Sequence, residues 1–95
     1  MDELSAVRAI VHHAGKALDL KRAFLFGSRA RGDAREDSDI DLAFDHSSAL
    51  PIWADFVNAM REQAPTLLDL DLIDLAQATP ELRARILAEG TLVHG

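Results

Sequence analysis

The chain has 95 residues, 48% of them hydrophobic, and carries a formal charge of −6 from 16 acidic and 10 basic residues. This length suits one folded domain with a single modest core, so we expect one domain spanning residues 1–95. The acidic balance argues against stable sequence-independent DNA binding, which depends on Lys and Arg neutralising phosphates. The absence of cysteine excludes disulfides and thiolate metal sites.

The sequence also carries no sign of export or of membrane insertion. Its N-terminus lacks a basic-then-apolar targeting pattern, and no run approaches the roughly 18 apolar residues of a membrane span. We therefore expect a cytoplasmic protein without a membrane partner.

The first half of the chain is predicted to contain a helix and two strands. Apolar residues recur every three or four positions over residues 2–19, which predicts an amphipathic helix with Asp2 as its cap. Residues 22–26 form a short, largely apolar run typical of a buried strand, and alternation over residues 39–44 predicts a second strand. Only about a dozen residues join the two strands, so we expect antiparallel pairing.

The second half is predicted to alternate helix and strand in the same way. Its elements are a polar loop over residues 45–49, a helix from Pro51 to Pro65, a strand over 67–75, a helix from Thr79 to Gly90 and an edge strand over 91–93. This order is typical of a compact two-layer α/β domain, with helices against one face of a small mixed sheet.

Acidic residues stand at alternate positions on strands that are expected to fill a core. Asp39 and Asp41 are two residues apart, so both carboxylates leave the same face, with Cα atoms about 6.6 Å apart. Asp71 on the third strand can point the same way if the strands are neighbours. Three carboxylates without cations would raise one another's pKa values, and a divalent cation would supply the missing charge. Oxygen ligands suit Mg²⁺, and two such ions about 3.5–4 Å apart suit phosphoryl chemistry.

The competing interpretation is that these acids simply lie on a sheet face exposed to solvent. Acidic residues at alternate positions of a strand usually indicate such a face. We adopt this interpretation for Asp45, Asp69 and Asp74, although Asp69 stays a competitor of Asp71 for the third carboxylate. His46 is placed in the loop after the second strand and receives no role.

A glycine and a serine follow the first strand, and two arginines follow them. Gly27 permits a positive φ or the close approach of a ligand to the backbone. If Ser28 begins a helical turn, its hydroxyl and the adjacent free N–H groups form a site suited to a phosphate chain. Arg29 and Arg31 stand beside it, where either could clamp a phosphate or both could meet an acidic partner. The sequence therefore joins a phosphate site and a metal site within fifteen residues.

The string "GSRARGDAREDSDIDL" resembles the signature of the DNA polymerase β-like nucleotidyltransferase superfamily, in which Gly-Ser, about ten residues and Asp-x-Asp follow one another. It is similar to the minimal nucleotidyltransferase branch, the antitoxin-type proteins paired with HEPN-domain toxins, and "ATPELRARILAEGTLVHG" resembles that branch's C-terminal helix and tail. The resemblance implies that Gly27 and Ser28 hold a nucleoside triphosphate and that Asp39 and Asp41 bind Mg²⁺. It also implies that Asp71 completes the metal site and activates the acceptor hydroxyl.

The function implied by the resemblance is transfer of AMP from ATP to a hydroxyl, in the expected case of tyrosine, on a HEPN ribonuclease toxin. The added phosphodiester and adenine would neutralise the toxin by charge and bulk. Two other functions stay open. The chain could be a catalytically silent antitoxin that binds its toxin stoichiometrically, or it could transfer a nucleotide to an RNA end or a small molecule. The acidic balance speaks against RNA, and the absence of a second lobe speaks against a small molecule.

Overall fold

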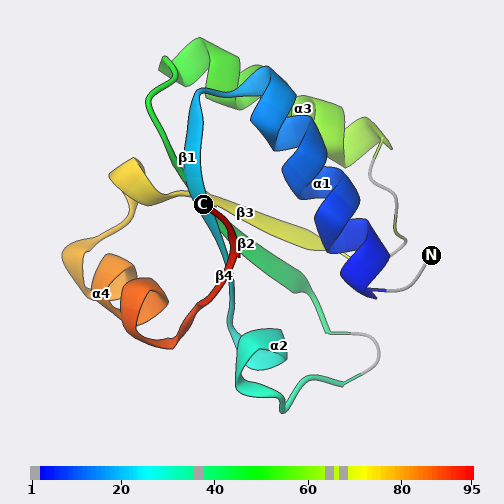
Figure 1. Cartoon of the computed structure of the whole chain (residues 1–95), viewed down its shortest axis with the longest axis vertical. Helices are drawn as coiled ribbons and strands as arrows, with labels where there is room; N and C mark the ends of the chain where they lie inside the picture. Colours follow the sequence, from blue (N-terminus) through cyan, green and yellow to red (C-terminus); the bar gives the residue numbers. More distant parts are fainter. Residues whose placement is uncertain (1–2, 36–37, 64–65, 67–68) are drawn as a thin grey trace.

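The computed structural model describes residues 3–35, 38–63, 66 and 69–95. In these ranges helices and strands alternate along the chain (Figure 1). The elements are α1 (Glu3–Ala17), β1 (Leu20–Phe26), α2 (Ser28–Arg31), β2 (Ile40–His46), α3 (Leu50–Gln63), β3 (Leu70–Asp74), the 3-10 helix η1 (Leu75–Gln77), α4 (Pro80–Glu89) and β4 (Thr91–His94). Within the described ranges, none of the helices has the length and apolar character that crossing a membrane requires.

The strands of the described part of the chain form one mixed sheet in the order β3-β2-β1-β4. β1 pairs antiparallel with β2 and with β4, whereas β2 and β3 run parallel. The short link between β1 and β2 allows the antiparallel return that the sequence predicts, and α3 supplies the crossover that parallel neighbours need. β1 and β2 therefore lie at the centre of the sheet, with β3 and β4 at its edges.

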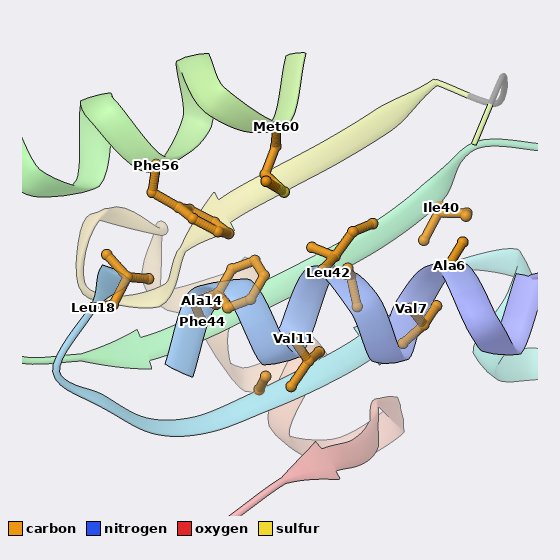
Figure 2. Packing of buried hydrophobic residues seen from close by; sticks show 12 residues of the cluster. Ala6, Val7, Val11, Ala14, Leu18, Ile40, Leu42, Phe44, Phe56 and Met60 are labelled. Atoms are coloured by element: carbon orange, nitrogen blue, oxygen red, sulfur yellow. The ribbon is translucent and has the colours of Figure 1, made fainter. Parts of the chain in front are cut away.

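One face of the sheet is covered by α1 and α3, which bury the larger of two hydrophobic clusters. The buried residues of α1 recur at the spacing of one helical face: Ala6, Val7, Ile10, Val11 and Ala14. Leu18, directly after the helix, is buried with them. Leu42 and Phe44 of β2 point toward these helices, and Phe56 and Met60 of α3 close over the strand (Figure 2). Because side chains alternate along a strand, the odd-numbered residues of β2, including Asp41, point to the opposite face of the sheet.

Part of that opposite face is covered by α4 and η1, where the smaller cluster lies. Ile86 of α4 packs in this cluster with Phe24, Ala43 and Leu75. Thr79 caps α4, as the sequence predicts, because its hydroxyl accepts a backbone N–H at 3.2 Å. The predicted fold class, a small mixed sheet with helices packed against it, is confirmed. The expectation that the helices lie against one face only is wrong, because α4 packs on the second face.

The predicted bounds agree with the described elements to within a few residues, with one instructive exception. The sequence predicts that His46 lies in a loop, but β2 continues through this residue because its ring is buried against Trp53. The predicted cap at Asp2, the helix end at Pro65 and the expected strand residues 67–68 lie outside the described residues.

Candidate active site

Three aspartates gather where β2 and β3 begin. The parallel register sets Asp41 beside Asp71, and the antiparallel register sets Asp41 beside Phe26 at the end of β1. Asp39 precedes β2 by one residue, so alternation directs its side chain to the same face as Asp41. Asp39 and Asp71 are exposed, and Asp41 is half-buried. The structure therefore brings the predicted trio together at one end of the face that α4 covers only in part.

Gly27 forms the turn that follows β1 and faces the carboxylate of Asp41. Its φ of 74° and ψ of −154° belong to a region that residues with a Cβ rarely adopt. A Cβ added to Gly27 would lie 3.2 Å from the carboxyl carbon of Asp41 and would collide with its oxygen Oδ2. Glycine is therefore required here both for the backbone conformation and for the close approach to Asp41.

The pKa of Asp41 is raised above its ordinary value. Burial is the largest cause, followed by repulsion from the carboxylates of Asp71 and Asp39, while Arg29 and Arg31 act in the opposite direction. The two guanidinium groups do not cancel the burial and the repulsion. With all three carboxylates ionised, this end of the sheet is short of positive charge.

The donor set fits a hard divalent cation that is shared with a substrate. Among the described residues, no three His, Cys, Asp or Glu side chains converge closely enough to hold a metal ion by themselves. Mg²⁺ prefers carboxylate oxygens as protein ligands and keeps waters and phosphate oxygens in the rest of its coordination sphere. An open set of carboxylates beside the Gly27 turn, with a raised pKa at Asp41, therefore fits Mg²⁺ bound together with a phosphate.

The short helix α2 carries three of the residues predicted to hold phosphate, namely Ser28, Arg29 and Arg31. Ser28 is its first residue and is half-buried, and Arg31 is its last residue and is exposed. The Nε atom of Arg31 lies 3.4 Å from Oδ2 of Asp33, in an ion pair that is exposed on both sides. Exposed ion pairs contribute little to stability, so Arg31 can exchange Asp33 for a phosphate at small free-energy cost.

Arg29 connects α2 to the segment that enters β2. Its Nη2 atom donates to the carbonyl oxygen of Ser38 at 2.6 Å, and its Nε atom donates to the carbonyl oxygens of Ser38 and Asp39 at 3.2 and 3.3 Å. These bonds hold the Asp39 backbone next to the helix that follows Gly27. The sequence did not indicate this positioning, and the predicted contact of Arg29 with phosphate stays a prediction.

Asp74 lies at the far end of the same two strands, next to His46, and the sequence did not indicate this pair of buried side chains. His46 Nδ1 accepts the Ser48 N–H at 3.1 Å, so a neutral His46 carries its proton on Nε2. That atom lies 3.2 Å from Oδ1 of Asp74, out of line for a hydrogen bond, while the His46 ring stacks on Trp53 with centroids 5.1 Å apart. The prediction of a solvated Asp74 is wrong, because this carboxylate is buried where it accepts the Ala76 N–H and faces His46.

Comparison with known proteins identifies the family. Residues 9–95 match the family model described as Polymerase beta, Nucleotidyltransferase. The chain therefore belongs to the polymerase β nucleotidyltransferase family. A search of curated proteins found no match to this chain.

Within that family the chain is similar to the minimal nucleotidyltransferases of toxin–antitoxin systems. A crystal structure of a toxin–antitoxin with AMP-PNP matches with a TM-score of 0.79 and 27% identity, over 93% of this chain and 72% of that one. A mutant of the toxin–antitoxin MntA-HpeT matches with a TM-score of 0.76 and 27% identity, over 94% and 72%. A protein assigned as a minimal nucleotidyltransferase matches with a TM-score of 0.67 and 32% identity, over 96% and 95%. The resemblance inferred from the sequence is confirmed.

Proposed function

We propose that this protein is a Mg²⁺-dependent enzyme that transfers AMP from ATP to a hydroxyl group, in the expected case of tyrosine, on a HEPN-domain ribonuclease toxin. The observation that carries the proposal is the register that sets Asp41 between Asp71 and the Gly27 turn. Family membership supports nucleotidyl transfer. Similarity to a chain in a toxin–antitoxin structure with AMP-PNP supports ATP as the donor and a toxin as the acceptor.

The residues of the site divide the binding of ATP between them. Gly27 brings the backbone close to Asp41, so the triphosphate would lie between the turn and the carboxylates. Ser28 and Arg31 would donate hydrogen bonds to its phosphates. When bound, Mg²⁺ neutralises charge between carboxylates and phosphates and polarises the α-phosphate. The residues that would hold Mg²⁺ are Asp39, Asp41 and Asp71.

In the transfer step, the proton acceptor would be Asp71, the exposed carboxylate on the edge strand β3. Asp71, exposed beside Asp41, would accept the proton of the acceptor hydroxyl. The acceptor oxygen forms a bond to the α-phosphorus, and the bond from that phosphorus to the oxygen bridging the β-phosphate breaks. Pyrophosphate leaves with the electron pair. The product is a phosphodiester between AMP and the toxin side chain.

The proposal is tested by incubating the purified chain with α-labelled ATP, Mg²⁺ and the product of the neighbouring gene as the expected toxin. We expect label on that partner, no label with Asp71→Asn, and retained transfer with Asp69→Asn. Asp69 is the matched control because it lies two residues earlier, before β3 begins. Transfer retained by Asp71→Asn would move the proton-accepting role to Asp69. A stable complex without label would indicate a silent binding antitoxin, and label on RNA or on a small molecule would reassign the acceptor.

A further inference from the structure

A small cavity lies between the Gly27 turn and α4. Its volume is about 130 Å³. It is lined by Phe26, Gly27 and Arg31 on one side and by Leu82, Arg85 and Glu89 of α4 on the other. Leu82, Arg85 and Glu89 are three and four residues apart, so one face of α4 forms this wall. The cavity therefore begins at the same turn that abuts Asp41.

The two arginines of α4 have different surroundings. Arg83 is engaged in the fold, because its Nε and Nη2 atoms donate to the carbonyl oxygens of Leu75 and Ala76 at 3.2 and 3.1 Å. Arg85 is exposed and, among the described residues, makes no hydrogen bond or ion pair. Its neighbour Ile86 is buried in the smaller cluster and fixes the helix over the sheet. Arg85 is therefore held at the cavity by the packing of α4, with its guanidinium available to a ligand.

We propose that Arg85 binds the terminal phosphate of the nucleoside triphosphate, acting with Arg31 across this cavity. The inference rests on the proposed function, because it extends the same nucleotide site. Across the sheet, Asp71, Asp41 and Phe26 lie in one row on neighbouring strands. Neighbouring strands are about 4.8 Å apart, so a triphosphate that lies along this row, with its α-phosphate at the carboxylates, would extend past Gly27 to Phe26 and the cavity.

The charges of the cavity wall agree with an anionic ligand and also limit its affinity. Arg31 and Arg85 contribute two positive charges and Glu89 one negative charge, which leaves a net formal charge of +1. The apolar floor around Phe26 and Leu82 strengthens charge-assisted hydrogen bonds by lowering the local dielectric constant. Glu89 opposes a phosphate, so removing its charge is expected to tighten triphosphate binding.

The test is calorimetric titration of the full chain with ATP, ADP and AMP in the presence of Mg²⁺. Arg85→Ala is expected to weaken ATP binding about tenfold, the effect of losing one hydrogen bond to a charged group, and to leave AMP binding unchanged. Arg85→Lys keeps the charge but not the planar fork, so it should restore part of the affinity. Glu89→Gln should strengthen ATP binding and leave AMP binding unchanged. Arg61→Ala, on the exposed surface of α3, is the matched control and should change neither.

Each result decides between the inference and the function on which it rests. Unchanged ATP binding by Arg85→Ala would overturn the inference and leave the proposed function standing. Equal weakening of ATP and AMP would also overturn it, because the cavity would then hold the nucleoside. A wild-type chain that binds no ATP would overturn both. Loss of nucleotidyl transfer to every partner, with ATP binding still dependent on Arg85, would overturn only the proposed function. Arg85→Ala is expected to unfold at the wild-type temperature, since Arg85 makes no hydrogen bond or ion pair among the described residues.

Discussion

The two ends of the β2–β3 pair carry acidic residues in opposite circumstances. At the start, Asp41 lies beside Asp71 and close to Asp39, and its pKa is raised by burial and by both neighbours. At the end, Asp74 is more deeply buried, yet it accepts the hydrogen bond that caps η1 at 3.1 Å and faces His46 at 3.2 Å. The supply of partners, more than the degree of burial, therefore distinguishes a carboxylate that is accommodated by the fold from one whose charge is left uncompensated.

The largest expected effect is at the end of the strand pair where Asp39, Asp41 and Asp71 lie, and it should change activity without loss of stability. Asp41→Asn should lower nucleotidyl transfer by about a hundredfold or more, because charge stabilisation aimed at the reacting phosphate is lost. Without Mg²⁺ the variant should unfold at the wild-type temperature or above it, since the neutral amide removes repulsion from Asp71 and Asp39. Labelled-ATP transfer and thermal unfolding measure the two effects. A variant that loses both activity and stability would contradict the distinction between the two ends.

The next effect breaks the structural end. Asp74→Ala removes the cap of η1 and leaves the buried His46 Nε2 without its facing carboxylate, so it should destabilise the fold by about 2 kcal/mol. Asp71→Ala, three residues earlier on the same strand, is the matched control and should change stability by less than about 0.5 kcal/mol. Urea denaturation compares the two. Equal losses at Asp71 and Asp74 would remove the contrast.

The two arginines of α4 provide the same kind of comparison, because Arg83 is hydrogen-bonded within the fold and Arg85 is not. Arg83→Ala removes two hydrogen bonds to η1 carbonyls and should cost about 1 kcal/mol of stability, because the remaining carbonyls can turn to water. Arg85→Ala should leave the free energy of unfolding unchanged. Parallel urea titrations of the two variants provide the measurement, and a larger loss at Arg85 would show that this side chain has an unrecognised structural contact.

The smallest expected effect is a dependence on pH. Because the folded-state pKa of Asp41 is raised above its ordinary value of 3.8, the folded chain binds this proton more tightly than the unfolded chain does. The associated stability is fully present below the ordinary value and is lost as pH rises through the raised pKa. The stability advantage of Asp41→Asn over wild type, measured without Mg²⁺, should therefore be present at neutral pH and shrink on acidification. An advantage that stays constant with pH would argue against the raised pKa.

Much of the candidate site could be predicted because its residues are local or follow strand alternation. Gly27 and Ser28 directly follow a recognisable strand. The link from there to Asp39 and Asp41 is short, so the two strands are expected to pair antiparallel, as they do. Asp71 needed only the further condition that its strand be a neighbour of β2, which the parallel register meets.

The rest depends on contacts that spacing does not encode. Alternation puts Asp74 on the apolar face, but only the burial of His46 from another strand shows how that carboxylate is accommodated. Arg29 looks like a phosphate clamp in the sequence, although its described hydrogen bonds go to backbone carbonyls. Arg83 and Arg85 are two residues apart on one helix and carry the same charge, and only the packing of α4 shows that their surroundings differ.

The parallel pairing of β2 with β3 makes the assembly of the three aspartates depend on the completion of folding. Asp39 and Asp41 sit within the β1–β2 hairpin, whose contacts are close in sequence. Asp71 reaches them only after α3 has crossed the sheet, a contact of long sequence separation whose loop-closure entropy delays its formation. Under the proposed function, a nascent or partly folded chain would lack Asp71 as the proton acceptor, so that AMP would be transferred only by molecules that have finished folding.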